Sequence, residues 1–106
     1  MEYIEIGGEK RPVKYGWNAL ATFGKLSKNG VDLSVFEKGI PFEDVLILIY
    51  AGLKEGARKE DKEFGARIED IGDWLDEDVD KIEEFMKVFT DQMPKSKKVQ
   101  APEGAS

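Results

Sequence analysis

The chain has 106 residues, of which 41% are hydrophobic and 36% charged, and its formal net charge is −6. This size and balance are typical of one soluble domain with one modest core. The acidic charge argues against binding to nucleic acid or to anionic membranes, and the absence of His and Cys removes the commonest catalytic bases, thiol nucleophiles and metal ligands. We therefore expect a binding protein with no catalytic, metal or cofactor site.

The first predicted element is a β-hairpin over residues 2–15, in which apolar residues alternate along both strands. Gly7–Lys10 provide the turn. We expect a four-residue loop that places Ile4 opposite Val13, because this register pairs apolar side chains. Pro12 lacks an N–H group, so the second strand should be an edge strand.

A first helix is predicted from about Trp17 to Ser27, with a stop signal at Asn29–Gly30. Ser34–Glu37 then has the spacing of a capping box and can begin a single turn. The apolar stripe of the first helix consists of Trp17, Leu20, Phe23 and Leu26.

The next helix should follow Pro41, which suits a first-turn position. It is apolar nearly all round, so we expect it at the centre of the core. Its strongly charged last part, Lys54–Lys62, should project into solvent, and Glu63–Arg67 should connect it to the following helix. Its main stripe consists of Phe42, Val45, Leu46, Ile49 and Leu53.

The segment Ile68–Asp80 places an apolar stripe on one helical face and carboxylates on the other. Asp76 or Asp78 can cap a final helix, which Pro94 ends. The stripe of the first of these helices consists of Ile68, Ile71, Trp74 and Leu75. The stripe of the second consists of Val79, Ile82, Phe85, Met86, Phe89 and Met93.

These elements predict a mainly α (α+β) fold. It comprises the hairpin at 2–15 and a small bundle of four to five helices within 17–93. Residues 1–93 should form a single globular domain, and residues 94–106 a disordered tail rich in Lys, Ser, Ala and Pro. The N-terminus shows no signal peptide, and no apolar run is long enough to span a bilayer. A cytoplasmic location is therefore expected.

Acidic residues invite two chemical interpretations, and neither is favoured. Asp76, Asp78 and Asp80 have the alternate spacing of a calcium loop, but Lys81 and Lys87 replace its turn glycine and its bidentate glutamate. Paired surface carboxylates lack the pocket that acid–base catalysis needs. Helix capping and solvation explain these acids better.

Trp17 and Trp74 each allow two interpretations. Both lie on apolar helix stripes, which is typical of core residues. Tryptophan is also enriched among residues that anchor protein partners. The sequence leaves the choice open.

Three segments together resemble one family. They are V-K-Y-G-W-N-A-L at 13–20, Y-A-G-L-K-E-G-A at 50–57 and E-D-I-G-D-W-L at 69–75. In this order, behind an N-terminal hairpin, they resemble a tail assembly chaperone of long-tailed (siphovirus-type) bacteriophages. The resemblance implies a small non-catalytic protein of the infected bacterial cytoplasm, absent from the mature virion. It also implies that the chain binds the tape-measure protein and recruits tail-tube protein to it.

The resemblance directs attention to helix-in-groove binding, because a tape-measure protein is long and largely helical. The candidate partner-binding residues are Trp74, Leu75, Phe85 and Phe89. An unpaired hairpin edge could also pair with a second copy, which would give a homo-oligomer.

Two alternatives compete with the chaperone hypothesis. An acidic inhibitor could mimic DNA through the carboxylates of Glu69–Glu84, although five lysines interrupt the acidic surface and −6 is a mild charge for a mimic. A structural tail component that stays in the particle is the other alternative.

Overall fold

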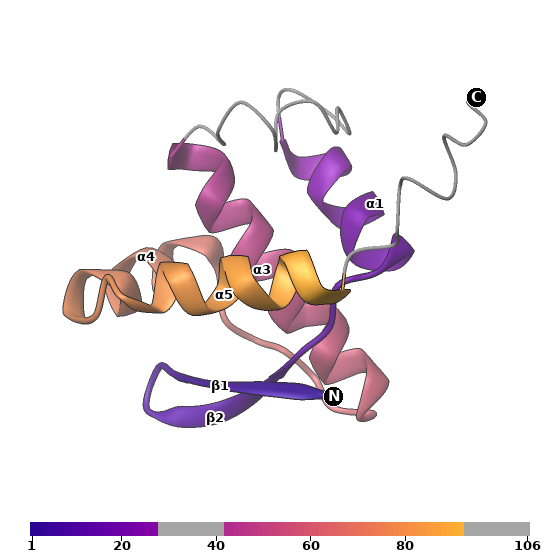
Figure 1. The fold of residues 1–106 in the computed structure, drawn as a ribbon, viewed down its shortest axis with the longest axis horizontal. Coiled ribbons are helices and arrows are strands. Elements are labelled where there is room, and N and C mark those ends of the chain that lie inside the picture. Colours follow the sequence, from indigo (N-terminus) through magenta and orange to yellow (C-terminus); the bar gives the residue numbers. More distant parts are fainter. Residues whose placement is uncertain (28–41, 93–106) are drawn as a thin grey trace.

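The computed structural model describes residues 1–27 and 42–92, which form a hairpin followed by four helices (Figure 1). This confirms the predicted α+β class. The turn expected at Ser34 and the tail at 94–106 lie outside the described residues. No described helix is long and apolar enough to cross a membrane. The elements are β1 (Glu2–Ile6), β2 (Glu9–Val13), α1 (Trp17–Leu26), α3 (Phe42–Lys59), α4 (Ile68–Glu77) and α5 (Lys81–Gln92).

The hairpin turn is tighter than predicted. Ile4 pairs with Arg11, so the expected pairing of Ile4 with Val13 is wrong. Gly7 and Gly8 alone form the turn, with φ angles of 66° and 86°. A two-residue turn with two positive φ angles matches the twist of the strands, and glycine adopts these angles without steric cost. The register is therefore set by the geometry of the turn rather than by the pairing of apolar side chains.

Among the described residues the sheet has two strands, so β2 is an edge strand, as predicted from the position of Pro12. Pro12 lies opposite Tyr3. In an antiparallel pair of strands, only every second pair of opposite residues exchanges backbone hydrogen bonds, beginning here with Ile6 and Glu9 next to the turn. Tyr3 and Pro12 form a pair that does not, so no hydrogen bond between the strands is lost because proline lacks an N–H group. Just after β2, the Lys14 N–H donates to the Gly52 carbonyl at 3.1 Å, which attaches the hairpin to α3.

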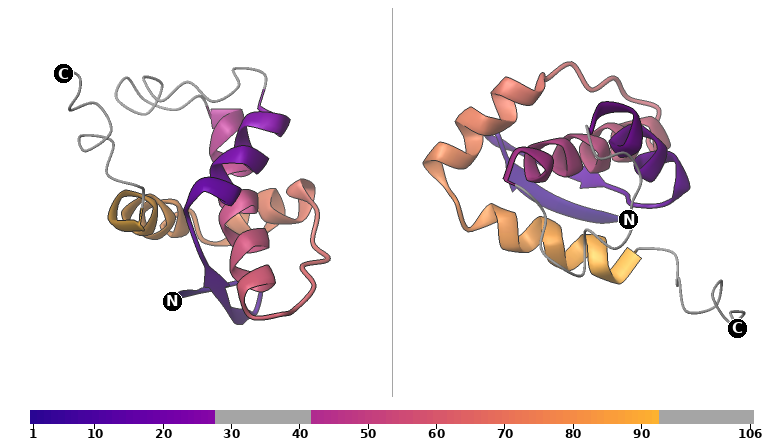
Figure 2. Two further views of the ribbon diagram at one scale, coloured as in Figure 1. Left: turned by 90° about the vertical axis from the view of Figure 1, so that its right-hand side faces the viewer. Right: turned by 90° about the horizontal axis from the view of Figure 1, so that it is seen from above.

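Helix α3 passes through the middle of the fold and packs against α1, β2, α4 and α5. Figure 2 shows α4 and α5 diverging around α3 and the hairpin from the turn that joins them. Leu48, Ile49, Ala51 and Leu53 of α3 are at most 1% exposed. The central position predicted from its apolar surface is confirmed.

The second half of α3 departs from its prediction. Lys54, Arg58 and Lys59 are exposed, but Glu55 and Ala57 are buried, so the segment does not simply project into solvent. Gly52 and Gly56 lie one turn apart on its inner face: Gly52 packs against the Tyr15 ring, and Gly56 allows the backbone of β2 at Pro12 to approach the helix closely.

Helices α4 and α5 complete the core: α4 packs against α3, and α5 packs against β1 and α3. Ile71 and Leu75 of α4 are buried, as expected from their stripe. Val79 was expected on the apolar stripe of the last helix, but it lies before α5 in a turn and is 64% exposed. The prediction that Asp76 or Asp78 caps the final helix is wrong, because Asp76 lies within α4, Asp78 is the C-terminal cap residue of α4, and α5 begins only at Lys81. The buried core side chains of α5 are Phe85, Val88 and Phe89.

Tyr15 connects the hairpin, α3 and α5. It is fully buried, and its hydroxyl donates to the Leu48 carbonyl at 2.9 Å. Its backbone N–H donates to Oε1 of Gln92 at 2.8 Å, and its ring meets Phe89 edge to face at 5.2 Å. One side chain therefore holds three parts of the chain together.

Tyr15 should make folding stability fall in alkali. Burial raises the pKa of its phenol above the ordinary value of 10.0. Its contribution to stability is therefore complete below about pH 10 and is lost as the pH rises further, because only the unfolded chain then releases the proton readily. We expect urea unfolding of Tyr15→Phe to depend less steeply on pH between about pH 10 and 11.5 than that of the unmodified chain. Parallel pH curves for the two proteins would contradict this assignment.

Candidate functional site

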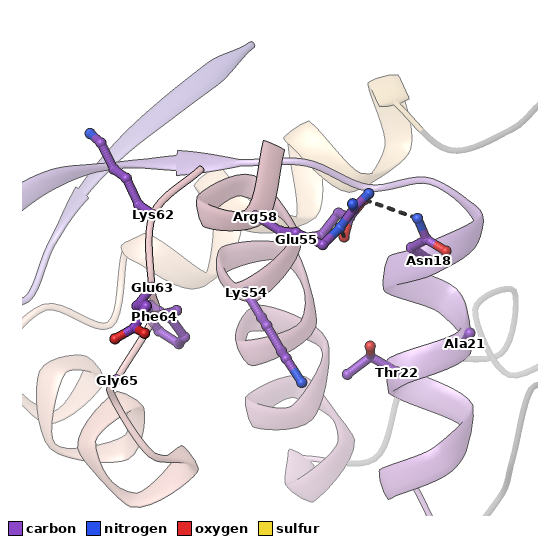
Figure 3. A pocket seen from close by; sticks show the side chains of 10 residues that line it. All are labelled: Asn18, Ala21, Thr22, Lys54, Glu55, Arg58, Lys62, Glu63, Phe64 and Gly65. Atoms are coloured by element: carbon purple, nitrogen blue, oxygen red, sulfur yellow. Dashed lines mark hydrogen bonds and ion pairs between the residues drawn. The ribbon is translucent and has the colours of Figure 1, made fainter. Parts of the chain in front are cut away.

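An open groove of about 750 Å³ lies between α1, α3 and the connector that follows α3 (Figure 3). Helix α1 contributes one wall, α3 the floor, and the connector the opposite wall. The lining is mixed in character, with apolar side chains beside cations and carboxylates. The lining residues are Asn18, Ala21, Thr22, Lys54, Glu55, Arg58, Lys62, Glu63, Phe64 and Gly65.

Glu55 joins the two helices that form the groove. It accepts hydrogen bonds from Nε and Nη2 of Arg58, both at 2.8 Å, and from Nδ2 of Asn18 at 3.3 Å. The bidentate hydrogen bonds from Arg58 are the main cause that lowers the pKa of the Glu55 carboxyl group, and the Asn18 amide adds to the effect. Glu55 is only 7% exposed, so this carboxylate stays charged in a position where an unpaired one would be costly.

Lys54 differs from the other cations of the groove. Its side chain is directed between α3 and α1, near Thr22 (Figure 3). Within residues 1–27 and 42–92 it makes no hydrogen bond or ion pair, whereas Arg58 pairs with Glu55 and Lys62 with Glu60 at 3.5 Å. An exposed ammonium group is therefore available at the centre of the groove.

Phe64 supplies the apolar wall on the connector. It is half-buried, and its ring lies 5.8 Å from that of Tyr50, tilted by 57°. This contact fixes the ring although its residue lies outside any helix. Across the groove, the exposed methyl group of Ala21 continues the apolar surface on α1. The groove can therefore contact apolar atoms and charged groups together.

Trp17 lies at the start of α1 and is 64% exposed. It stands one turn before Ala21 and immediately before Asn18, both of which line the groove. Of the two interpretations that the sequence allowed, core residue and exposed anchor, the structure shows an exposed side chain. Leu26, from the same predicted stripe, is also 43% exposed.

The four candidate partner-binding residues lie elsewhere, and none of them lines the groove. Leu75, Phe85 and Phe89 are 6%, 0% and 5% exposed, so they are core side chains in this structure. Trp74 is half-buried against the hairpin: the Arg11 guanidinium lies 4.6 Å from its ring centroid, and the ring covers Gly7. Their burial favours the core interpretation.

The sequence did contain a signal for the groove. Lys54 and Arg58 are four residues apart, which places them on one face of α3, whereas Lys62 lies beyond the end of the helix in the connector. The charged run Lys54–Lys62 by itself predicts only exposure to solvent. Only the packing of α1 against α3, with Asn18 donating to Glu55, shows that these charged residues border a groove.

Among the described residues, no cluster of three or more His, Cys, Asp or Glu side chains could hold a metal ion. Within residues 1–27 and 42–92, the groove offers Lys54 without an ion pair, Arg58 and Lys62 in ion pairs, and apolar side chains, which suits recognition of another molecule. Comparison with known proteins gave no match: no family model fits the sequence, and no curated protein or solved structure is significantly similar to it.

Proposed function

We propose that the chain is a non-catalytic tail assembly chaperone of a long-tailed bacteriophage. In this proposal it binds the tape-measure protein, here called the client, and recruits tail-tube subunits to it. The three-segment resemblance supplies the class of partner. The observation that supports a binding role is the exposure of Trp17 beside the open groove.

The physical argument concerns what an exposed tryptophan can do. Trp17 presents a large, rigid apolar surface to water, which is unfavourable unless a partner covers it. Tryptophan side chains carry a disproportionate share of binding energy at protein interfaces. A client with long apolar helices offers the surface that would cover it, and the acidic net charge of −6 favours solubility of the resulting complex.

The proposed place of action is the cytoplasm of the infected bacterium, before the tail is complete. The chaperone would leave when tail-tube subunits cover the client, and would be absent from mature particles. Finding the chain in purified virions would instead favour the structural tail component.

The first experiment is co-expression with the tape-measure protein encoded near it in the same genome. The proposal predicts that an otherwise insoluble tape-measure protein becomes soluble and co-purifies with this chain. The measured quantities are the soluble fraction of the client and the stoichiometry of the purified complex. Absence of both rescue and complex would overturn the proposal.

Trp17→Ala should weaken the complex with the client without destabilising the fold. We expect a loss of affinity of about 2 kcal/mol, the size typical of an interface tryptophan. The melting temperature should change little, because the side chain is 64% exposed. The matched control is Val79→Ala, since Val79 is equally exposed but lies in the turn between α4 and α5. Equal affinities of the two variants for the client would show that Trp17 is not part of the interface.

The acidic inhibitor remains the second candidate because α4 and α5 present exposed carboxylates, among them Glu69, Asp73 and Glu83. Salt separates the two hypotheses. Binding through carboxylates that imitate phosphates should collapse between low and moderate salt, whereas apolar binding should largely survive. A salt titration of any purified complex makes this comparison directly.

A further inference from the structure

The two outer edges of the hairpin differ in what lies beside them. In an antiparallel pair, the residues that exchange no hydrogen bonds with the other strand direct their backbone groups outward. On β2 one such residue is Pro12, and its carbonyl group lies against Gly56 of α3. Two residues further on, the Lys14 N–H donates to the Gly52 carbonyl at 3.1 Å. Helix α3 therefore covers the outer edge of β2 from Pro12 onward.

The outer edge of β1 has no such neighbour. Its outward backbone groups belong to Tyr3 and Glu5, which lie opposite Pro12 and Lys10. The N–H and C=O groups of these two residues make no hydrogen bond with another described residue. Both side chains are exposed. Donors and acceptors that recur at every second residue along an edge are matched by another extended strand.

Helix α5 packs against a face of the hairpin and not against this edge. Ile4 and Ile6 belong to the same core cluster as Phe85 and Phe89, so α5 lies over the face that carries these two isoleucines. Outward backbone groups point along the sheet, roughly at right angles to the side chains. A strand added beside β1 would therefore extend the sheet and leave the core contacts in place.

We propose that two copies of this chain pair through β1, antiparallel, with Tyr3 of each copy opposite Glu5 of the other. The two-fold axis then passes between the two Ile4 residues. The Tyr3–Glu5 pair occurs twice, and each pair exchanges two hydrogen bonds. The two hairpins become one four-stranded sheet, which is more stable than an isolated hairpin. This inference concerns self-association and goes beyond the proposed function.

The sequence of β1 favours this register over the two neighbouring ones. Placing the two Glu5 residues opposite each other would bring like charges together and would leave Tyr3 opposite Gly7 in the turn. Placing the two Tyr3 residues opposite each other would leave Glu5 opposite Met1, which lies outside the strand. Only the register that pairs Tyr3 with Glu5 uses all the outward groups of β1.

A second copy is also a better occupant of this edge than the client. The client of the proposed function presents helices, whose backbone groups are already paired within each helix. Every copy of this chain instead carries the same open edge, and two-fold pairs are the commonest homo-oligomers. The net charge of −6 on each copy opposes association. The dimer should therefore become tighter as added salt screens this repulsion.

Sedimentation equilibrium of the complete chain tests the dimer. We expect monomers and dimers to coexist at concentrations on the order of 0.1–1 mM, because a short strand pairing buries a small interface. Glu5→Pro should weaken the dimer by about tenfold or more, because it removes an outward N–H group from both copies and places a ring at the edge. Pro12 shows that the hairpin accepts proline at an outward position.

Lys10→Pro is the matched control, because Lys10 lies opposite Glu5 and its N–H faces the other edge of the hairpin. It should leave the dimer nearly unchanged, and circular dichroism checks that both proline variants fold. A chain that stays monomeric throughout this range, or equal effects of the two variants, would overturn the proposal. An extended client peptide that binds the monomer and is lost in Glu5→Pro would assign the edge to the client instead.

Disulfide cross-linking tests the register without proline, since the chain contains no cysteine. A mixture of Tyr3→Cys and Glu5→Cys chains should form a covalent dimer under mild oxidation, because opposite residues of a hydrogen-bonded pair have Cα atoms about 5.5 Å apart. Either variant alone should not, because its two cysteines would lie diagonally across the pair, beyond the reach of a disulfide. Cross-linking of Glu5→Cys alone would overturn the register, and no cross-link in the mixture would overturn the pairing.

Discussion

Replacing Phe85 by alanine is expected to destabilise the fold by about 3–5 kcal/mol, which is much of the total stability of a domain of this size. Phe85 is 0% exposed and belongs to the core cluster that joins α5 to α3 and the hairpin. Removing its ring takes away buried apolar surface and leaves a cavity that the surrounding helices can fill only in part. Urea unfolding followed by circular dichroism measures the loss.

This experiment also decides between the two roles considered for Phe85. A core residue loses stability on truncation, whereas an exposed contact residue would lose affinity for the client and keep its fold. Val79→Ala is the control, because Val79 is 64% exposed near the start of α5 and its truncation should change stability by less than about 0.5 kcal/mol. Normal stability of Phe85→Ala together with lost binding would restore the partner-contact assignment.

The second large effect is expected at Gly56, where alanine should cost about 2–3 kcal/mol. A Cβ atom there would overlap the carbonyl group of Pro12 and approach the nitrogen of Val13 to 2.8 Å. Alanine normally gains about 1 kcal/mol over glycine inside a helix. Here that gain is outweighed, because the clashing atoms belong to the backbone of β2, and the hairpin must move away from α3.

Gly72→Ala provides the matched control, with the opposite expected sign. Gly72 lies inside α4, and the nearest atom to a Cβ there is Cδ1 of Leu46 at 3.9 Å, an ordinary contact distance. The same substitution should therefore stabilise the fold by about 0.5–1 kcal/mol through helix propensity. Thermal unfolding of both variants tests the argument. Equal shifts would show that close approach of β2 does not control the cost at Gly56.

The candidate site was the part of the molecule least predictable from sequence. The four residues selected as partner contacts, Trp74, Leu75, Phe85 and Phe89, were chosen because they are large and lie on amphipathic helices. The same properties describe core residues, and burial distinguishes the two only after the helices have packed. The groove residues were set aside for the converse reason, because charged side chains on a helix usually face only solvent.

The sequence by itself determined the order and type of the described elements. Apolar periods of two and of about 3.6, together with glycine and proline punctuation, are local properties, so they identified the hairpin, the four helices and the central position of α3. Only the tertiary structure decided the hairpin register, the exposure of Trp17 and the groove that Glu55, Arg58 and Asn18 hold together. These features depend on turn angles and on contacts between segments far apart in the chain, and local patterns of hydrophobicity carry no information about such contacts.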